Sequence, residues 1–271
     1  MKKIVSLVLA LMMVFALTLA FTSCGEVKDL KKIEKNGKIV VGITNYYPMD
    51  FIGEDDESWD GFDAQLATKF AEELGVDVQF VLIKWDNKSL ELKSGNIDLI
   101  WNGMTVTDKL AEEMDFSVSY AENKQVAVIR KEKASAINSK ETLKNAKIAV
   151  EQGSAGASAA KDELGATNVS ELSAQVNALL EVKAGTSDAC IIDYTMAYGL
   201  VGKGDYADLM IVDTDAVSFE REEFAVGLRK GSDLTEKLNE FLKKCYKDGT
   251  LASLASKYNG AIALNDEKLS K

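Results

Sequence analysis

The sequence of 271 residues contains no histidine, and this absence excludes much chemistry. Without an imidazole the chain has no Ser-His-Asp or Cys-His nucleophile pair and no metal site with histidine ligands. It also lacks the one side chain whose ordinary pKa lies near neutrality. Most hydrolase mechanisms are therefore excluded, although a carboxylate general acid is not. We assign no catalytic residue, no metal ion and no cofactor to this sequence.

Basic side chains are also scarce. There are 32 Lys plus Arg against 43 Asp plus Glu, so the formal net charge is −11, and the only arginines are Arg130, Arg221 and Arg229. Binding to nucleic acid needs a basic surface that displaces counterions from phosphates. The charge balance therefore argues against a nucleic-acid partner.

Proline and cysteine are rare as well, with one proline, Pro48, and three cysteines. Cys190 follows an apolar, strand-like pattern and Cys245 lies in an amphipathic helical pattern, so we predict two buried thiols. Two cysteines in a chain of this length do not make a disulfide framework. Whether these two pair with each other stays open at this point.

The first 23 residues have the pattern of a targeting signal. Met1–Lys3 is basic, Ile4–Phe21 is uncharged and largely apolar, and small residues then surround Cys24. This segment resembles a bacterial lipoprotein signal, which implies cleavage before Cys24 and lipidation of that cysteine. The alternative is a permanent transmembrane anchor, because 18 residues is the lower edge of spanning length. Both interpretations place the rest of the chain outside the cytoplasm, at the cell surface or in the periplasm.

Removing residues 1–23, which contain two lysines, leaves 248 residues with 30 basic and 43 acidic side chains. This length suits two domains better than one. We expect an acidic monomer with a substantial core.

The remaining sequence alternates strand and helix patterns in two series. In the first, a helix that opens at Asp60-Gly61 repeats apolar residues every fourth position and ends at Gly75. The predicted segments of this series are the strand Lys38–Ile43, the helix 62–74, the strand Val76–Ile83, a short helix after Trp85 and the strand Ile97–Trp101. Those of the second series are the strand Lys147–Val150, a helix ending at Leu164, a strand near Val169, the helix Ala174–Ala184 and the strand Ala189–Asp193.

Two such series predict an α/β protein with two lobes, each a mostly parallel sheet flanked by helices. The extended runs Lys124–Arg130 and Glu223–Arg229 are interpreted as two crossover strands between the lobes. We expect lobe 1 to span residues 24–127, lobe 2 residues 128–221, and residues 222–271 to return to lobe 1. That last segment includes an amphipathic helix, Leu234–Tyr246. Ligands of such sheets bind at the carboxyl ends of the strands, and the double connection predicts a hinge.

An ordered set of short motifs over residues 30–260 resembles the amino-acid-binding proteins of ABC importers, the family 3 solute-binding proteins. In chain order these motifs are Lys38-Ile-Val-Val-Gly, Tyr46-Tyr-Pro-Met, Gly61-Phe-Asp, Leu74-Gly-Val, Ser94-Gly-Asn-Ile-Asp, Gly103-Met-Thr-Val-Thr, Asp115-Phe-Ser, Lys147-Ile-Ala-Val-Glu-Gln-Gly-Ser, Gly185-Thr-Ser-Asp-Ala, Asp193, Phe224-Ala-Val-Gly-Leu-Arg-Lys and Asp248-Gly-Thr-Leu. The resemblance implies a two-lobe periplasmic-binding-protein-like fold of type II. It also implies a non-enzymatic protein that captures an amino acid or a closely related amine and delivers it to a membrane permease with its ATPase.

The resemblance implies a set of ligand contacts in lobe 1. Tyr46 matches the aromatic residue that stacks on the ligand; the alternative is a loop tyrosine packed on its neighbours. Trp85 matches the apolar wall on the opposite side of the ligand; the alternative is a core tryptophan. Loop 102–107 starts at Asn102. In the family, backbone N–H groups at the positions of Gly103 and Thr105, together with the Thr hydroxyl, bind the α-carboxylate of the ligand. The alternative is a plain helix cap at Thr107.

In lobe 2 the resemblance implies contacts from Ser154 and Asp193. Asp193 matches the carboxylate that pairs with the ligand's α-amino group, and its position after the apolar run Ala189–Ile192 places it at a strand's exit, where a buried charge needs a partner. The alternative is an N-cap for the following helix.

Two positions depart from the family pattern. Leu110 stands where the family has an arginine that holds the α-carboxylate, and Lys109 is one helical step, about 100°, away from that direction. Ala155 replaces one of two frequent hydroxyl residues. Because a buried carboxylate without a counter-charge is costly, two hypotheses follow. Either an amino acid binds with Lys109 or another lysine as counter-charge, or the ligand is an amine without an α-carboxylate, held by Asp193, Tyr46 and Trp85.

Other functions on the same fold stay open. Asp193 is a possible general acid of a dehydratase-like enzyme, but no second acid stands at a motif-defined spacing from it. A sensor or adhesion lipoprotein is the other alternative.

Overall fold

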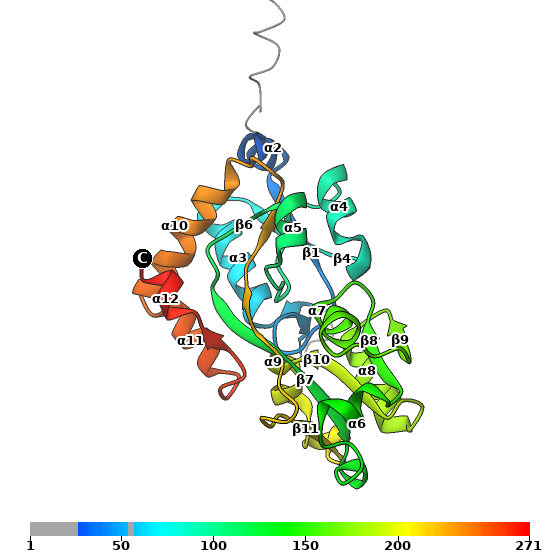
Figure 1. Ribbon diagram of the computed structural model, residues 1–271. Coiled ribbons are helices and arrows are strands. Elements are labelled where there is room, and N and C mark those ends of the chain that lie inside the picture. Colours follow the sequence, from blue (N-terminus) through cyan, green and yellow to red (C-terminus); the bar gives the residue numbers. More distant parts are fainter. Residues whose placement is uncertain (1–26, 54–56) are drawn as a thin grey trace, which may run out of the picture.

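The computed structural model describes residues 27–53 and 57–271, which form two α/β lobes stacked end to end (Figure 1). The predicted signal segment 1–23 and Cys24 lie outside the described residues. Within the described ranges, no helix combines the length and the apolar character needed to cross a membrane.

Lobe 1 is built on a five-stranded sheet with the order β4-β1-β5-β13-β6. Its strands are β1 (Lys38–Ile43), β4 (Asp77–Leu82), β5 (Leu99–Ile100), β6 (Asp115–Phe116) and β13 (Gly227–Leu228). Its helices are α2 (Asp29–Asn36), α3 (Phe62–Leu74), α4 (Lys88–Ser94), α5 (Asp108–Glu113), α10 (Leu234–Lys247), α11 (Thr250–Ser256) and α12 (Asp266–Leu269), with a 3-10 turn at Trp85–Asn87 and a hairpin of β2 (Phe51–Ile52) and β3 (Trp59–Asp60).

Lobe 2 is built on a sheet with the order β11-β7-β10-β8-β9. Its strands are β7 (Ala121–Arg130), β8 (Ile148–Glu151), β9 (Val169–Leu172), β10 (Ala189–Asp193) and β11 (Leu209–Val212). Its helices are α6 (Lys140–Lys144), α7 (Ala155–Ser158), α8 (Gln175–Ala184) and α9 (Tyr194–Leu200), with 3-10 turns at Lys131–Lys133 and Gly204–Tyr206 and a π-helical turn at Ala159–Glu163.

Local sequence explains why α3 forms where it does. Its N-cap, Gly61, has φ 123°, and a Cβ there would lie 2.2 Å from the Met49 carbonyl oxygen, so only glycine fits. Phe62, Leu66 and Phe70 are fully buried on one face. Gly75 ends the helix in the left-handed conformation, and its N–H donates to the Ala71 and Glu72 carbonyls. The helix has the predicted bounds.

Strand β7 is the main connection between the lobes. Residues 121–124 pair antiparallel with β12 (Arg221–Phe224), and residues 125–130 pair with β10 and β11 of lobe 2. The predicted crossover run Glu223–Arg229 is wrong as a single strand, because the chain leaves β12 after Phe224 and enters lobe 1 as the separate strand β13. β14 (Ala263–Leu264) also pairs with β7.

The two-lobe α/β prediction is confirmed, but the sheets are less parallel than we expected. In lobe 1, β4, β1 and β5 are parallel, whereas β13 and β6 are antiparallel to their neighbours. In lobe 2, β10, β8 and β9 pair in parallel, whereas β7 pairs antiparallel with both β10 and β11. The antiparallel strands include those that carry the chain between the lobes.

Both predicted buried thiols are confirmed. Cys190 lies in β10 of lobe 2 and Cys245 in α10 of lobe 1, and both are buried and free. Cys245 belongs to the apolar stripe of α10, which the sequence predicts from Leu234 onward.

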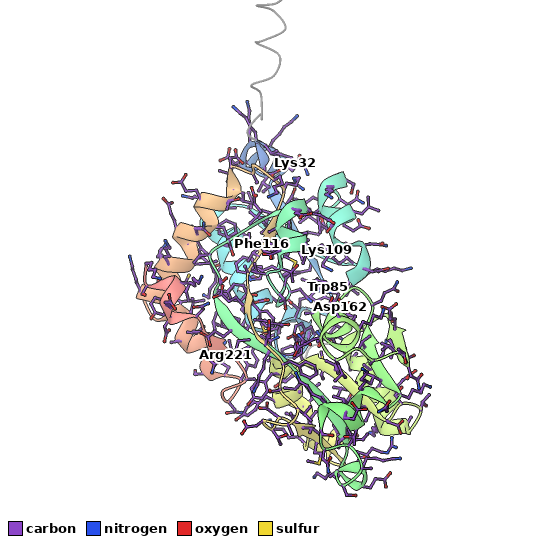
Figure 2. All side chains as sticks on the ribbon, viewed as in Figure 1. Lys32, Trp85, Lys109, Phe116, Asp162 and Arg221 are labelled. Carbon is purple, nitrogen blue, oxygen red and sulfur yellow. The ribbon has the colours of Figure 1, made fainter. Side chains whose placement is uncertain are left out.

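The two lobes meet at their facing ends. Figure 2 labels Trp85 on lobe 1 and Asp162 on lobe 2 close to this junction, with Lys32 and Phe116 further up lobe 1. Lys88 reaches from α4 across the junction, and its Nζ donates to the Gly153 carbonyl of lobe 2 at 2.9 Å. The lobes therefore touch directly.

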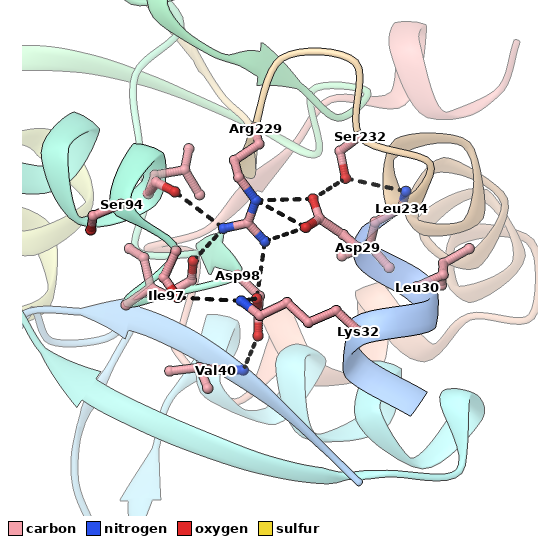
Figure 3. A network of polar contacts seen from close by, with 12 residues as sticks. Asp29, Leu30, Lys32, Val40, Ser94, Ile97, Asp98, Arg229, Ser232 and Leu234 are labelled. Atoms are coloured by element: carbon pink, nitrogen blue, oxygen red, sulfur yellow. Dashed lines mark hydrogen bonds and ion pairs between the residues drawn. The ribbon is translucent and has the colours of Figure 1, made fainter. Parts of the chain in front are cut away.

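A buried ionic network holds the returning chain segment to lobe 1 (Figure 3). The Arg229 guanidinium contacts Asp29 at 2.5 Å and Asp98 at 2.9 Å, and both carboxylates are almost fully buried. Arg229 also donates to the carbonyl of Ile97 at 2.6 Å, and Lys32 donates to Asp98 at 2.9 Å. This network joins α2, the start of β5 and the end of β13.

Replacing Arg229 by alanine leaves the buried Asp29 without its cation, so we expect a loss of about 3 to 5 kcal/mol of unfolding free energy. In a chain of this size, this corresponds to a fall in Tm of roughly 6 to 20 °C. The control is Arg221→Ala, because the Arg221 side chain is 89% exposed and its change should stay within about 0.5 kcal/mol. Urea unfolding of both variants measures the difference; equal losses would contradict the role of the network.

Candidate functional site

A cleft of about 810 Å³ opens between the lobes and is lined by residues of both. Figure 2 labels four of them, Trp85, Lys109, Asp162 and Arg221. Its walls come from the segments that follow β1 and β5 in lobe 1 and from the ends of β8 and β10 in lobe 2. These are carboxyl ends of strands, the place where α/β sheets bind ligands.

Asp193, the last residue of β10, is 6% exposed and is surrounded by amides. Its Oδ1 accepts hydrogen bonds from Asn123 at 2.6 Å and Gln125 at 2.8 Å, and its Oδ2 accepts from Gln175 at 2.5 Å. Burial raises the pKa of this carboxyl, and the amide donors oppose that rise. Asp193 stands at the N-cap position of α9, but its side chain makes no capping hydrogen bond, so the amides and not the helix hold its carboxylate.

Glu222 in β12 is a second carboxylate that the sequence did not single out. Its Oε2 accepts from the Thr105 hydroxyl at 3.1 Å and from the same Asn123 and Gln125 amides at 3.1 and 2.9 Å. Asn123 and Gln125 thus each donate to both carboxylates. Burial, followed by the charge of Asp193, raises the pKa of Glu222 to about 7.

Glu151, the last residue of β8, is a third carboxylate and is 3% exposed. Its Oε1 is buried and has no hydrogen-bond partner in the described part of the chain. Burial and then the charge of Asp193 raise its pKa to about 8, while Lys88 opposes that rise. Lys88 itself lies 4.6 Å above the Trp85 ring, and burial lowers its pKa to about 8.

The aromatic residues predicted for the site form its lobe 1 wall. Tyr46 is 2% exposed, and its buried hydroxyl lies next to the Asp193 carboxylate. Burial raises its pKa, and the neighbouring Asp193 charge raises it further. Trp85 lines the cleft but is 8% exposed and packs with Leu92 and Met104 in a small core cluster, so it is both wall and core.

The loop 102–107 differs in part from its predicted role. Both ends of the Asn102 amide are used by Thr44, at 2.7 and 2.8 Å, so this side chain fixes the loop to the end of β1. The Gly103 N–H donates to buried Asp63 at 2.6 Å, so the expectation that it receives a ligand carboxylate is wrong in this structure. Gly103 must remain glycine, because its φ is +53° and a Cβ would lie 2.7 Å from Tyr46.

Thr105 lines the cleft as expected, but its hydroxyl is directed at a protein carboxylate, Glu222. Thr107 caps α5 by accepting from the Leu110 N–H at 3.2 Å, which confirms the capping alternative for that position. Lys109 lines the cleft from the exposed face of α5, and Leu110 packs half-buried against the Trp85 cluster.

Ser154 also lines the cleft, and its hydroxyl has local partners. It donates to the Glu151 carbonyl at 2.8 Å and accepts from the Ala157 N–H at 3.1 Å, which makes it the N-cap of α7. In this structure the Ser154 hydroxyl therefore caps α7.

The sequence contains a pattern that could have identified Glu151 as a site residue. Glu151 follows the apolar run Ile148–Val150, as Asp193 follows Ala189–Ile192, and the same argument applies to both. Glu222 and the amide residues Asn123, Gln125 and Gln175 carry no such signal.

Comparison with known proteins agrees with this architecture. The profile of the bacterial extracellular solute-binding proteins, family 3, matches residues 39–261, which is most of the chain. The chain belongs to this family. The L-cystine-binding protein of Escherichia coli strain K12 is 30% identical over 233 residues, covering 86% of this solute-binding protein and 86% of the relative.

Solved structures show the same fold. A substrate-binding protein of an ABC uptake transporter from Streptococcus pneumoniae, with bound histidine, has a TM-score of 0.80 and 32% identity, covering 90% of this solute-binding protein and all of that chain. A reconstructed ancestral amino-acid-binding protein, described as a precursor of cyclohexadienyl dehydratase, has a TM-score of 0.76 and 33% identity, covering 84% and 98%.

The buried carboxylates predict how stability depends on pH. Glu222 and Glu151 have raised pKa values of about 7 and about 8, so the folded protein binds more protons than the unfolded chain between about pH 4.5 and 8. Their stabilising contribution is complete below the unfolded pKa and is lost as the pH rises through the folded pKa. We expect the Tm without ligand to fall by at least about 5 °C between pH 5 and 8, because a pKa raised by one contributes about 1.4 kcal/mol and each kcal/mol moves the Tm of a chain of this size by roughly 2 to 4 °C.

The groups facing these carboxylates are Asp193 for Glu222, and Lys88, Asp86 and Asp193 for Glu151. The double variant Glu151→Gln/Glu222→Gln removes both titrations and should flatten the pH dependence. Calorimetry of both proteins across this range measures the effect; identical slopes would contradict it.

Proposed function

We propose that this protein is the extracytoplasmic solute-binding component of an ABC importer, which captures an amino acid or a closely related amine between its lobes and delivers it to a membrane permease. Family membership supports the transport role. The observation that carries the ligand class is the buried carboxylate of Asp193, which faces the cleft with amide partners and with no cationic partner from the described residues. A buried carboxylate of this kind is stabilised by a positively charged ligand.

The relatives support an amine-bearing ligand. The Escherichia coli relative is named for L-cystine, and the Streptococcus pneumoniae structure contains histidine. Both compounds carry an α-ammonium group, and Asp193 is the residue that we propose pairs with such a group. Tyr46, Trp85 and Thr105 would form the wall beside it.

We further propose that the protein is a lipoprotein attached to the membrane through Cys24, after removal of residues 1–23. The basic start, the apolar run and the small residues around Cys24 support this attachment. The permease and the ATPase are then separate chains of the importer.

The lobe boundaries that we propose follow the crossover strands. Lobe 1 comprises residues 24–127 and 222–271, and lobe 2 comprises residues 128–221. The change of pairing partner along β7, from β12 to β10 and β11, supports a boundary within this strand. Closure about β7 and β12 would bring Lys88 to Gly153, the contact present here.

Binding can be tested by thermal unfolding of the purified protein with a panel of amino acids and amines. A ligand at 100 times its Kd adds about 2.7 kcal/mol, which should raise the Tm by roughly 5 to 11 °C. Asp193→Asn should weaken binding of that ligand by roughly 30-fold or more, because it removes one partner of a buried charge pair.

The matched control is Asp205→Asn, since the Asp205 side chain is 93% exposed and lies outside the cleft. If no amino acid or amine changes the Tm, the proposal fails, and a sensor or adhesion role becomes the favoured alternative. If a ligand is chemically converted on incubation, the dehydratase-like alternative gains, because Asp193 and Glu222 together would then supply the acid and base that the sequence did not reveal.

A further inference from the structure

The cleft collects acidic groups that protein cations do not neutralise. Asp193 and Glu222 are cross-strand neighbours of Gln125 and Asn123 on β7, and the two acids share both amides as donors. Residues 123 and 125 lie on the same face of the strand, so both carboxylates are held on that face. Two negative charges that share the same hydrogen-bond donors repel each other unless a cation lies between or beside them.

The basic residues of the cleft wall are already engaged or lie at its rim. Lys88 is the buried one; its Nζ donates to the carbonyls of Gly153 and Trp85, and Glu151 is its largest favourable charge partner. Lys161 pairs with Glu171. Lys109 is exposed, and the Arg221 side chain is 89% exposed beside Glu122.

The two other arginines lie outside the cleft. Arg229 is held by Asp29 and Asp98, and Arg130 donates to the Val182 carbonyl in lobe 2. No buried cation of the described cleft wall is therefore free to pair with a carboxylate of a ligand.

One buried carboxylate oxygen at the cleft lacks a hydrogen-bond partner in the described part of the chain and suits a donor from a ligand. It is the Oε1 of Glu151, a residue that is 3% exposed. Glu151 ends β8 and Asp193 ends the adjacent β10, and both residues line the cleft. A buried carboxylate oxygen without a partner is stabilised by a hydrogen-bond donor, which an ammonium or guanidinium group supplies.

From this arrangement we infer that the ligand is a small organic cation without a carboxylate group, whose ammonium or guanidinium group lies against Asp193 and Glu222, with a second N–H donor toward Glu151. This inference rests on the proposed transport function and narrows its substrate class. A carboxylate on the ligand would face the Asp193–Glu222 pair without a counter-charge. The hydroxyl of Thr105, which would otherwise attract it, already donates to Glu222.

Pairs of compounds that differ only by the carboxylate test this inference: agmatine with arginine, cadaverine with lysine, putrescine with ornithine, and histamine with histidine. We expect the decarboxylated member of at least one pair to bind at least tenfold more tightly than its amino acid in titration calorimetry at pH 8. Argininamide, which keeps the α-amine but not the carboxylate charge, should follow agmatine rather than arginine.

A charge-removing variant locates the effect. Glu222→Gln should weaken binding of the preferred amine at least tenfold, whereas Glu240→Gln, which removes the same charge from the exposed face of α10, should change it less than twofold. Equal effects of the two variants would contradict the placement of the cation at Glu222.

The outcomes separate this inference from the proposed function. If the amino acid binds as tightly as the amine or more tightly in every pair, the inference is overturned and the transport proposal stands. Loss of that amino-acid binding in Lys88→Met would then assign the carboxylate to Lys88. If no member of any pair and no amino acid binds, the proposed function fails as well.

Discussion

Strand β7 is the constraint on which the site depends, because it belongs to both lobes. Its first half pairs with β12 and its second half with β10 and β11. One face of this strand therefore carries Asn123 opposite Glu222 and Gln125 opposite Asp193. The amides act as a bridge between acids that lie 29 residues apart in sequence, on strands that enter from different parts of the chain.

Because of this arrangement, acidic groups are concentrated in the cleft before any ligand enters. Amide donors stabilise the carboxylates by hydrogen bonding, but they do not supply a positive charge. The raised pKa values of Glu222 and Glu151, about 7 and about 8, express the cost of burying negative charge there. A cationic ligand offsets that cost, and the site gains selectivity because an anionic group would add to it.

Much of the fold follows from local sequence patterns. The helix over Phe62–Leu74 and the strands over Lys38–Ile43 and Ala189–Asp193 have the predicted bounds, since apolar periodicity and terminal glycines define them. The run Glu223–Arg229 was interpreted as one strand because β propensity does not show where a chain changes partner. Only the tertiary structure divides it between β12 and β13.

The sequence by itself determined the α/β class, the two lobes, the strand ends that form the cleft and the presence of Asp193 at one of them. It did so because apolar periodicity and the acid after a buried strand are local signals. The tertiary structure alone decided three contacts. Glu222 lies beside Asp193 on shared amide donors, the Gly103 N–H donates to Asp63, and Lys88 donates to the Gly153 carbonyl of the other lobe. These are contacts between segments far apart in the chain, and their partners are set by strand pairing and lobe contact, which no local pattern encodes.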